Sequence, residues 1–400
     1  MKGMIKVTEK LFYEDPYICE AQCEVEDVIE KDGKFEIVLK STPFYPEGGG
    51  QPSDLGYIDN IKVEYVYEEK ETIYHVTSER PTGKFVKCKV DSERREDHIQ
   101  QHSGEHLMSA AFFRLYKVSN AGFHLGNDYV TIDIQMKDMT EEMINKAEIE
   151  ANSYIFRNEE VKTYFLTKDE ALKLPLRKEI KAEGTIRIVQ MGENIDYSAC
   201  CGTQVRRTGE VGLIKIIKWE KYKGMTRVYI KCGLRALKDY QLKHNYITEI
   251  ARGFSVEDSA VIEKIKNNNE EIASLKKQVN NLYSKIAYSE AEKLIKNAAS
   301  ELICVEYEEE DFDFLDKLYE CLKDKKFILI LSSIRDKKLL FAHNGDFEVK
   351  CGKFFKDNLK EFNGRGGGND KRAQANFQDE TSMRKFSEYI KKSQKNSKAI

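Results

Sequence analysis

The sequence predicts an α+β protein of several domains. Its 400 residues exceed what a single compact core usually contains. Short alternating runs typical of β-strands fill the first 95 residues, helical periodicity appears from Glu96, and a proline-free heptad pattern follows. We expect four parts: an N-terminal small β-barrel at 1–95, an α+β domain at 96–245, a helical coiled-coil linker at 250–299 and a small α/β domain at 300–400.

The composition is typical of a soluble globular protein, with 40% hydrophobic and 33% charged residues and a formal net charge of −3. This net charge does not by itself indicate a nucleic-acid partner. No apolar run approaches the length of about 18 residues that a membrane span needs, and residues 1–17 lack the apolar core of a signal peptide. We therefore expect a cytoplasmic protein with no membrane partner, whose nine cysteines are reduced.

The first 95 residues alternate short β-type runs with turns. The runs are CEAQCEVEDVIEKDGKFEIVLKSTPFY, YIDNIKVEYVYEEKETIYHVT and GKFVKCKVD. The KDGK turn between two alternating runs indicates a β-hairpin. This pattern predicts a small antiparallel barrel or sandwich.

Residues 96–240 combine helices with mostly antiparallel strands. Helical periodicity covers 96–116 and 140–157, and the capping box Thr167–Glu170 begins a short third helix. β-Type runs lie at 161–167, 185–191, 212–222 and 226–233. This mixture predicts an α+β domain.

A long proline-free helix is expected from about Ser255, with an acidic residue three positions later at Asp258. One set of apolar residues recurs every seven positions, and a second set lies three positions after members of the first. Asn268 interrupts this heptad pattern. These residues are Ile265, Ile272, Leu275, Val279, Leu282 and Ile286. Three arrangements explain such a stripe: packing against its own domain, self-association of two or three chains, or an antiparallel hairpin within one chain.

The chain after Ala298 predicts a small α/β unit. β-Type runs at 301–308, 326–334 and 338–344 accompany a helical segment at 314–325. From Arg365 onward, nine Lys and Arg residues stand against four acidic residues. This excess of positive charge fits either a solubilising tail or a surface for a polyanion.

Two histidines lie four positions apart in the helical stretch QQHSGEHLMSAAF. At this spacing the imidazoles of His102 and His106 leave the helix on the same face, which suits either metal binding or polar packing. A thiolate would complete a zinc site, and Cys200 in DYSACCGTQVRRTGEVG is the best candidate. Three protein ligands leave one tetrahedral position for water or substrate, as in a catalytic zinc site.

Two glycine-rich stretches are candidate binding segments. In STPFYPEGGGQPSDLG the glycines allow close approach of backbone amides, and no Gly-Lys-Ser/Thr sequence follows to make a phosphate loop. A binding-site wall is favoured over a plain loop between strands because Gly-Gly-Gly-Gln lies between Thr42 and Asp54. In FNGRGGGNDKRAQANF a flexible backbone beside several cations suits phosphate groups. The residues of this second stretch are Arg365, Gly366, Gly367, Gly368, Lys371 and Arg372.

These stretches together resemble a known family. FYPEGGGQPSD, RREDHIQQHSGEHL and DYSACCGTQVRRTGEVG resemble the editing module of alanyl-tRNA synthetases and the free-standing AlaX-type trans-editing proteins. GRGGGNDKRAQ resembles the DHH-associated C-terminal domain of these synthetases and of the long AlaX form. The resemblance implies a trans-editing hydrolase that deacylates mischarged tRNA-Ala, notably seryl-tRNA and sometimes glycyl-tRNA. It also implies a chain that cannot charge tRNA, since no aminoacylation core precedes the β-rich start.

In this family one zinc ion is held by an H-x-x-x-H pair and a C-x-x-x-H pair. The resemblance assigns the first pair to His102 and His106 and begins the second at Cys200, but the fourth position holds Gln204 in place of histidine. An amide oxygen is a poor zinc ligand beside imidazole and thiolate. Three outcomes stay open: zinc held by three side chains and water, zinc held weakly with help from Gln204, or a metal-free and inactive site.

The resemblance also implies a catalytic pocket. Thr42 matches the threonine that pairs with the hydroxyl of a misattached serine, and Gln51 matches a glutamine of the editing pocket. We expect His102 and His106 to complete the catalytic set. Either the metal activates the attacking water, or it orients the tRNA 3′ end while a histidine acts as the base.

Contacts to tRNA are expected at two places. Arg94 and Arg95, just before the histidine pair, suit either the terminal phosphates or surface ion pairs. The C-terminal glycine-rich stretch is expected to add salt-sensitive affinity for tRNA. The helical linker or the C-terminal domain also offers a surface for a homodimer.

Two other functions are alternatives to the hydrolase. Because Gln204 replaces a metal ligand, the chain could be a catalytically impaired homologue that binds tRNA or another RNA. The C-terminal module also occurs in DHH phosphoesterases. The Asp-His-His signature of that group is missing from the sequence, which argues against this second alternative.

Overall fold

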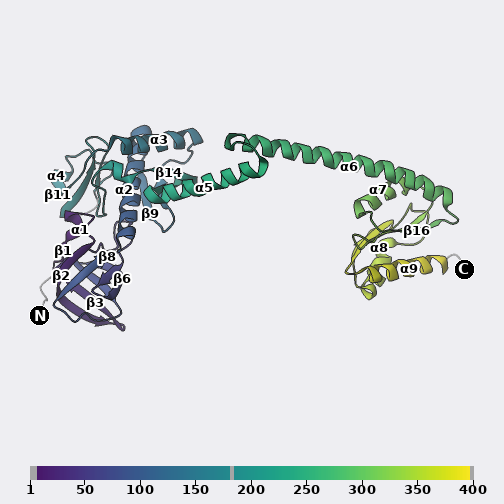
Figure 1. Ribbon diagram of the computed structural model, residues 1–400, viewed down its shortest axis with the longest axis horizontal. Helices are drawn as coiled ribbons and strands as arrows, with labels where there is room; N and C mark the ends of the chain where they lie inside the picture. The colour runs from purple at the N-terminus through teal and green to yellow at the C-terminus, as the bar shows by residue number, and fades with distance from the viewer. Residues whose placement is uncertain (1–6, 181–183, 397–400) are drawn as a thin grey trace. The chain divides into compact units, whose positions relative to one another are not determined.

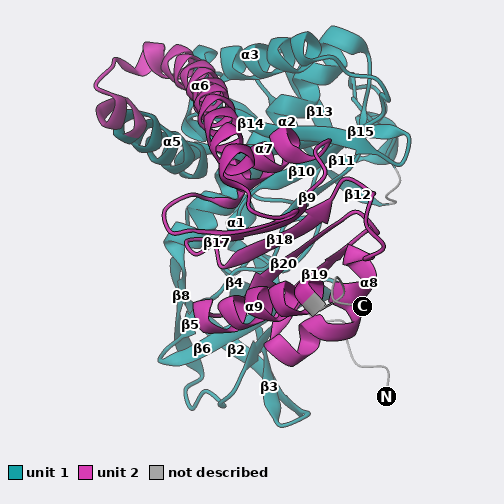
Figure 2. Cartoon of the chain, turned by 90° about the vertical axis from the view of Figure 1, so that its right-hand side faces the viewer, with its two compact units in different colours: residues 1–249 teal, residues 250–400 magenta. Residues whose placement is uncertain are grey.

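The computed structural model describes residues 7–180 and 184–396, which belong to two compact units, 1–249 and 250–400 (Figures 1 and 2). Sheets and helices occur in both units, so the expected α+β multidomain class is confirmed. The predicted division of unit 1 near residue 95 and the predicted linker at 250–299 stay predictions. Within the described ranges, every helix is too short or too polar to cross a lipid bilayer.

A closed antiparallel barrel forms the first part of unit 1, with the strand order β2-β3-β7-β6-β5-β8. At the predicted KDGK turn, Asp32 and Gly33 have positive φ angles of 53° and 76°, and β2 pairs with β3 on either side, which confirms the hairpin. In β8 buried and exposed residues alternate, as a half-buried strand requires. The elements are β1 Glu9–Lys10, α1 Leu11–Glu14, β2 Glu20–Lys31, β3 Lys34–Leu39, β4 Ser41–Thr42, β5 Gly56–Ile58, β6 Ile61–Glu69, β7 Thr72–Thr77 and β8 Phe85–Val90.

Two antiparallel sheets and the helices α2 to α5 form the rest of unit 1, and α5 continues past its boundary at residue 249. The sheets have the orders β14-β15-β10-β9 and β11-β12-β13, and α2 and α3 pack against the first sheet around a shared apolar core. The elements are α2 Ser92–Tyr116, β9 Asn120–Leu125, β10 Val130–Ile134, α3 Glu141–Arg157, β11 Val161–Thr167, α4 Lys168–Ala171, β12 Thr185–Met191, β13 Asp196–Ala199, the 3-10 helix Thr208–Val211, β14 Ile214–Tyr222, β15 Met225–Cys232 and α5 Gly233–Phe254.

Helix α2 begins one turn earlier than the predicted start at Glu96. The Asp91 side chain accepts a hydrogen bond from the backbone N–H of Arg94 and caps the helix at Ser92. The predicted helix at 140–157 and the capping box of Thr167 with Glu170 are both confirmed. Helix α2 therefore carries the two arginines in its first turn and the histidine pair on its later turns.

Unit 2 is built on one mixed sheet, with the strand order β16-β17-β18-β20-β19. Alternate residues of β17 face two separate cores, one with α6 and α7 and the other with α8 and α9, so the sheet is covered on both sides (Figure 1). The elements are the 3-10 helix Asp258–Ala260, α6 Val261–Asn297, β16 Leu302–Tyr307, α7 Phe312–Leu322, β17 Ile328–Ser333, β18 Lys338–His343, α8 Cys351–Asn358, the 3-10 helix Leu359–Phe362, β19 Gly364–Gly368, β20 Arg372–Phe377 and α9 Glu380–Asn396.

The predicted start of the long helix at Ser255 is wrong. Ser255 has a φ of 53°, and it lies in a break between α5 and α6, which begins at Val261. The heptad residues of α6 are exposed, between 37% at Ile265 and 55% at Leu282. The rest of unit 2 therefore leaves this stripe uncovered, which argues against packing on its own domain.

Two expectations for the C-terminal region are also corrected. The glycine-rich stretch is not flexible, because Gly364–Gly368 is strand β19, paired with β20 along its whole length. The basic segment is not a solubilising tail, because α9 buries Met383, Phe386 and Ile390 against the sheet. Both segments are parts of the folded unit.

Candidate metal centre

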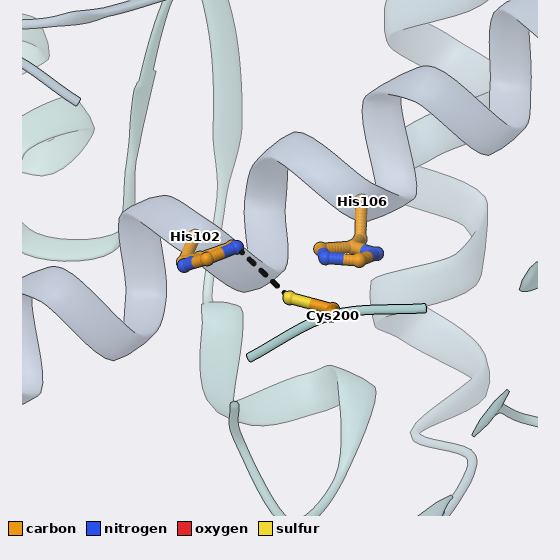
Figure 3. Close-up of side chains that lie close together, drawn as sticks. All are labelled: His102, His106 and Cys200. Atoms are coloured by element: carbon orange, nitrogen blue, oxygen red, sulfur yellow. Dashed lines mark hydrogen bonds between the residues drawn. The ribbon is translucent and has the colours of Figure 1, made fainter. Parts of the chain in front are cut away.

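Three side chains predicted as metal ligands meet at one point (Figure 3). The ligand atoms of His102, His106 and Cys200 all lie within 4.8 Å of one another. Successive turns of α2 present the two imidazoles with ring centroids 5.3 Å apart, and Cys200 follows the end of β13. The Cys200 sulfur lies 3.3 Å from Nε2 of His102. Two nitrogen donors and one sulfur donor form a set that suits zinc.

Hydrogen bonds fix which nitrogen of each imidazole faces the sulfur. Nδ1 of His102 donates to Oε1 of Gln51 at 2.9 Å, and this oxygen also accepts from the backbone N–H of Thr203, so it must be an acceptor. Nδ1 of His106 donates to Oδ2 of Asp196 at 3.0 Å. Both Nε2 atoms are therefore left with a lone pair for a cation.

The electrostatics of the cluster favour a thiolate. Burial raises the pKa of the Cys200 thiol, but the imidazoles of His102 and His106 hold it well below its usual range. Burial lowers the pKa of His106, but the Cys200 sulfur and Asp196 raise it to about 10. A cation bound at Nε2 of His106 would therefore compete with a proton for this nitrogen.

A buried polar network supports the His106 side of the cluster. Nε of Arg177 donates to Oδ1 of Asp196 at 2.8 Å, and Nη1 donates to Oδ1 of Asn120 at 2.6 Å. Asn120 in turn donates to Glu105 on α2 at 2.8 Å. Burial raises the pKa of Asp196, but Arg177 and His106 hold it well below its usual range, so Asp196 is an anion that fixes His106.

The glycine-rich loop forms a wall beside the cluster. Gly50 has a φ of 82°, and a Cβ atom there would lie 2.8 Å from the ring of Phe123. The Phe123 ring in turn lies 4.9 Å from the imidazole of His102, centroid to centroid. The next residue, Gln51, supplies the acceptor for His102. The loop thus contributes both shape and a positioning contact.

Gln204 lies beside the cluster without offering it an oxygen. Its Nε2 points to the Cys200 sulfur at 3.5 Å, while its Oε1 accepts a hydrogen bond from Ser103 at 2.8 Å. The side chain is 3% exposed. The structure thus brings Gln204 to the predicted place in the orientation of a donor.

Thr42 lies in β4, outside the closed barrel, and is fully buried in contact with His75 of the barrel strand β7. Nδ1 of His75 faces the carbonyl oxygen of Ile37, so Nε2 accepts the hydroxyl hydrogen of Thr42 at 2.8 Å. The Thr42 oxygen also accepts from the backbone N–H of Phe44 at 3.2 Å. One lone pair of the hydroxyl is left for another partner.

The two predicted phosphate-binding arginines of α2 have different environments. Arg95 is fully buried and pairs with Asp54, so neither a phosphate contact nor a surface ion pair applies to it. Arg94 donates from Nε and Nη2 to the carbonyl oxygen of Ser53 at 3.3 and 3.2 Å and is partly exposed. Arg95 thus joins α2 to the barrel, and only Arg94 keeps a role near the surface.

Arg187 and the Asp196–Arg177 pair are not identified by the sequence analysis. Arg187 donates from Nη1 to the carbonyl oxygens of Cys200 and Gly202 at 2.8 and 2.9 Å and so holds the loop that carries the sulfur. Asp196 stands in the quoted cysteine stretch, which is the one signal that could have indicated it. Arg177 and Arg187 stand 19 and 9 positions before Asp196, in segments without a motif.

A second candidate site lies in unit 2. A cavity of about 710 Å³ is lined by the glycine strand and by the cations Lys356, Lys360 and Arg365. Arg372 is engaged elsewhere, since it pairs with Asp316 at 2.5 Å and stacks on Tyr319. Of the predicted cations in this stretch, Arg365 is therefore the one that lines the cavity, and Lys371 is exposed without lining it.

Comparison with known proteins finds two matching family descriptions. Residues 186–229 match the threonyl and alanyl tRNA synthetase second additional domain, which includes the loop with Cys200 and Gln204. Residues 4–94 match the family of class II (A) tRNA synthetases. The first of these matches covers most of the chain from β12 to β15, including the cluster loop, and the second covers the barrel.

Curated relatives match most of the chain. The alanyl-tRNA editing protein AlaX-L of Pyrococcus horikoshii is 31% identical over 387 residues, which cover 91% of this chain and 93% of that protein. The alanine–tRNA ligase of Methanobrevibacter smithii is 33% identical over 399 residues, 90% of this chain and 43% of the ligase. That of Korarchaeum cryptofilum is 30% identical over 384 residues, 90% of this chain and 42% of the ligase.

Proposed function

Because the chain belongs to the family of alanyl-tRNA synthetase editing domains and long AlaX-type editing proteins, we propose that it is a trans-editing hydrolase. The proposed reaction splits the ester between the terminal ribose of tRNA-Ala and a wrongly attached amino acid. Seryl-tRNA-Ala is the proposed substrate, with glycyl-tRNA-Ala as a second. The observation that carries the proposal is the convergence of His102, His106 and Cys200 beside the glycine-rich wall.

Zinc fits the donor set of this cluster. Both imidazoles have Nδ1 engaged and Nε2 directed to the sulfur side, and the sulfur has the low pKa of a thiolate. When bound, zinc would supply a Lewis acid that polarises oxygen atoms near the ester. We propose that one ion is held by these three side chains.

The remaining residues of the site would orient and enclose the reacting groups. Gln51 and Asp196 fix the imidazoles, and Phe123 with the glycine loop shields one side of the cluster from water. We propose that Thr42 recognises serine by accepting its hydroxyl on the remaining lone pair. Alanine has no hydroxyl and would lack this interaction.

Binding of tRNA is proposed for both units. In unit 1, Arg94 would contact phosphates near the 3′ end. In unit 2, Arg365 and the lysines of the cavity would contact the tRNA backbone. The exposed stripe on α6 would join two chains in a homodimer.

A deacylation assay tests the proposal. Purified protein with its zinc content measured should release serine from seryl-tRNA-Ala and spare alanyl-tRNA-Ala, and a chelator should remove the activity. Protein with a full metal content that binds tRNA and releases no serine would contradict the hydrolase and support the impaired homologue.

A further inference from the structure

The amide of Gln204 has one orientation that satisfies its surroundings. The backbone N–H of Val205 donates to Oγ of Ser103 at 3.0 Å, so the hydroxyl hydrogen of Ser103 is available to Oε1 of Gln204. Reversing the amide would place its carbonyl oxygen against the anionic sulfur of Cys200. The hydrogen-bond pattern therefore keeps Nε2 of Gln204 toward the sulfur, at 3.5 Å.

The Cys200 sulfur has a second N–H donor. The backbone N–H of Gly202 lies 3.3 Å from the sulfur. A Cβ atom at Gly202 would overlap the His102 ring, so glycine is required for the backbone to approach this closely. N–H groups directed at a thiolate stabilise its charge, which is the usual work of residues around metal ligands.

We propose that Gln204 is a positioning residue that donates to the Cys200 thiolate and does not bind the cation. The cation is then held by His102, His106 and Cys200, and it can take one further small ligand from outside, an anion or an oxygen donor. The inference rests on the metal site of the proposed function.

Cobalt substitution of the full chain tests the ligand count without an activity assay. Cobalt(II) absorbs visible light in a way that depends on its coordination, and azide is a small anion that can occupy an open position. The wild-type spectrum should shift on addition of azide. The spectrum of the Gln204→Leu variant should shift as well. The zinc affinity of this variant, measured by competition with a chelator, should fall about tenfold because the Cys200 thiolate loses one N–H donor.

The Gln204→His variant is expected to have the opposite effect to Gln204→Leu. A histidine there can act as a fourth ligand, so the cobalt spectrum should no longer respond to azide and zinc should bind more tightly. Circular dichroism of each variant checks that the fold is retained. Ser103→Ala serves as a control that frees the Gln204 oxygen without removing its amide, and its spectrum should still respond to azide.

Two results would overturn the inference. One is a wild-type spectrum that ignores azide while Gln204→Leu responds, since Gln204 would then be a ligand. The other is a wild-type chain that binds no cobalt at all. Neither readout uses tRNA, so a chain that passes these tests and still releases no serine would contradict the proposed hydrolase and leave the ligand assignment in place.

Discussion

At the scale of single residues, each imidazole of the cluster depends on a hydrogen bond from Nδ1 to keep its Nε2 lone pair available. For His102 that bond is to Gln51, which lies 51 positions earlier in the chain. Loss of this acceptor would let the ring rotate or carry its proton on Nε2, the nitrogen that faces the sulfur. The role of Gln51 is therefore best tested by measuring the affinity of the protein for zinc.

We expect Gln51→Leu to weaken zinc binding about 10- to 100-fold, because the ring of His102 loses the contact that fixes its orientation. Competition with a chelator of known affinity measures the effect. Gln135→Leu, at an exposed position, is the control and should bind zinc as the wild type does. Equal affinities in all three proteins would show that Gln51 does not position the ring.

His75 makes the stability of unit 1 depend on pH. Burial lowers its pKa to about 4, whereas the unfolded residue has the ordinary value of about 6.5. Between these values the unfolded chain binds a proton that the folded chain does not, so the free energy of unfolding falls as the pH falls. Across the pH range between these two pKa values, the free energy of unfolding changes by about 3 kcal/mol.

We expect the wild type to lose about 2 kcal/mol more than His75→Asn between pH 7 and pH 5, because asparagine does not titrate there. Urea unfolding followed by the fluorescence of Trp219, the single tryptophan, reports on unit 1. Parallel pH profiles for the two proteins would mean that His75 takes up its proton without unfolding.

The sequence predicts the side chains that form the candidate metal site. It does not predict most of the residues that hold these side chains in position through hydrogen bonds. His102 and His106 share one helix face, so their spacing alone predicts their proximity. Arg177 and Arg187 act through contacts with segments 13 to 19 residues away, and no spacing rule indicates such pairs. The predicted roles of Arg95 are wrong because only the fold shows that it is buried against Asp54.

At the scale of elements, α2 packs unusually close to strand β15 at Gly104. A Cβ atom at this position would overlap the side chain of Cys232 and lie 3.6 Å from Ile214. The glycine thus sets how near the helix lies to the sheet. It thereby also sets the distance of the histidine pair from the sheet. A glycine in the middle of a helix is otherwise unfavourable compared with alanine.

We expect Gly104→Ala to destabilise unit 1 by about 1–3 kcal/mol, because overpacking in a core exceeds the gain in helix propensity. Gly122→Ala is the matched control, since no atom lies within 4 Å of a Cβ atom there, and its effect should stay within about 0.5 kcal/mol. Urea unfolding by Trp219 fluorescence compares them. Equal stability of the two variants would contradict the close packing.

Elements whose own residues carry a turn or capping signal are predicted well from the sequence. Elements whose conformation depends on a neighbouring strand are not. The capping box at Thr167 and the KDGK hairpin follow from turn chemistry within four residues. The glycine strand β19 gives no strand signal in sequence. Side chains at Gly366 and Gly368 would overlap the backbone of β20, so its conformation comes from the neighbouring strand.

At the scale of the whole molecule, the stripe on α6 indicates self-association. Its heptad residues are exposed in unit 2, and exposed apolar rows of this period are typical of coiled-coil interfaces. We expect the wild type to sediment as an oligomer and the double variant Leu275→Lys with Leu282→Lys to sediment as a monomer. Ser274→Lys with Ser284→Lys, off the stripe, should leave the mass unchanged.

The division into two units suggests that affinity for tRNA and chemistry are separable. The candidate metal centre lies wholly in unit 1, whereas the cavity with Arg365 lies in unit 2. Each phosphate contact releases condensed counterions, so its loss reduces the dependence of binding on salt. Arg365 is exposed and lines the cavity, whereas Arg372 is engaged with Asp316.

We therefore expect Arg365→Ala to weaken tRNA binding and to reduce the slope of log affinity against log salt by about 1. Arg372→Ala should leave this slope unchanged and lower the stability of unit 2, because it breaks the contact with Asp316 and Tyr319. Titration of labelled tRNA at several salt concentrations measures the slope, urea unfolding followed by circular dichroism measures the stability, and zinc content checks that the metal centre of unit 1 is intact. A slope lowered by Arg372→Ala and unaffected by Arg365→Ala would place the phosphate contact outside the cavity.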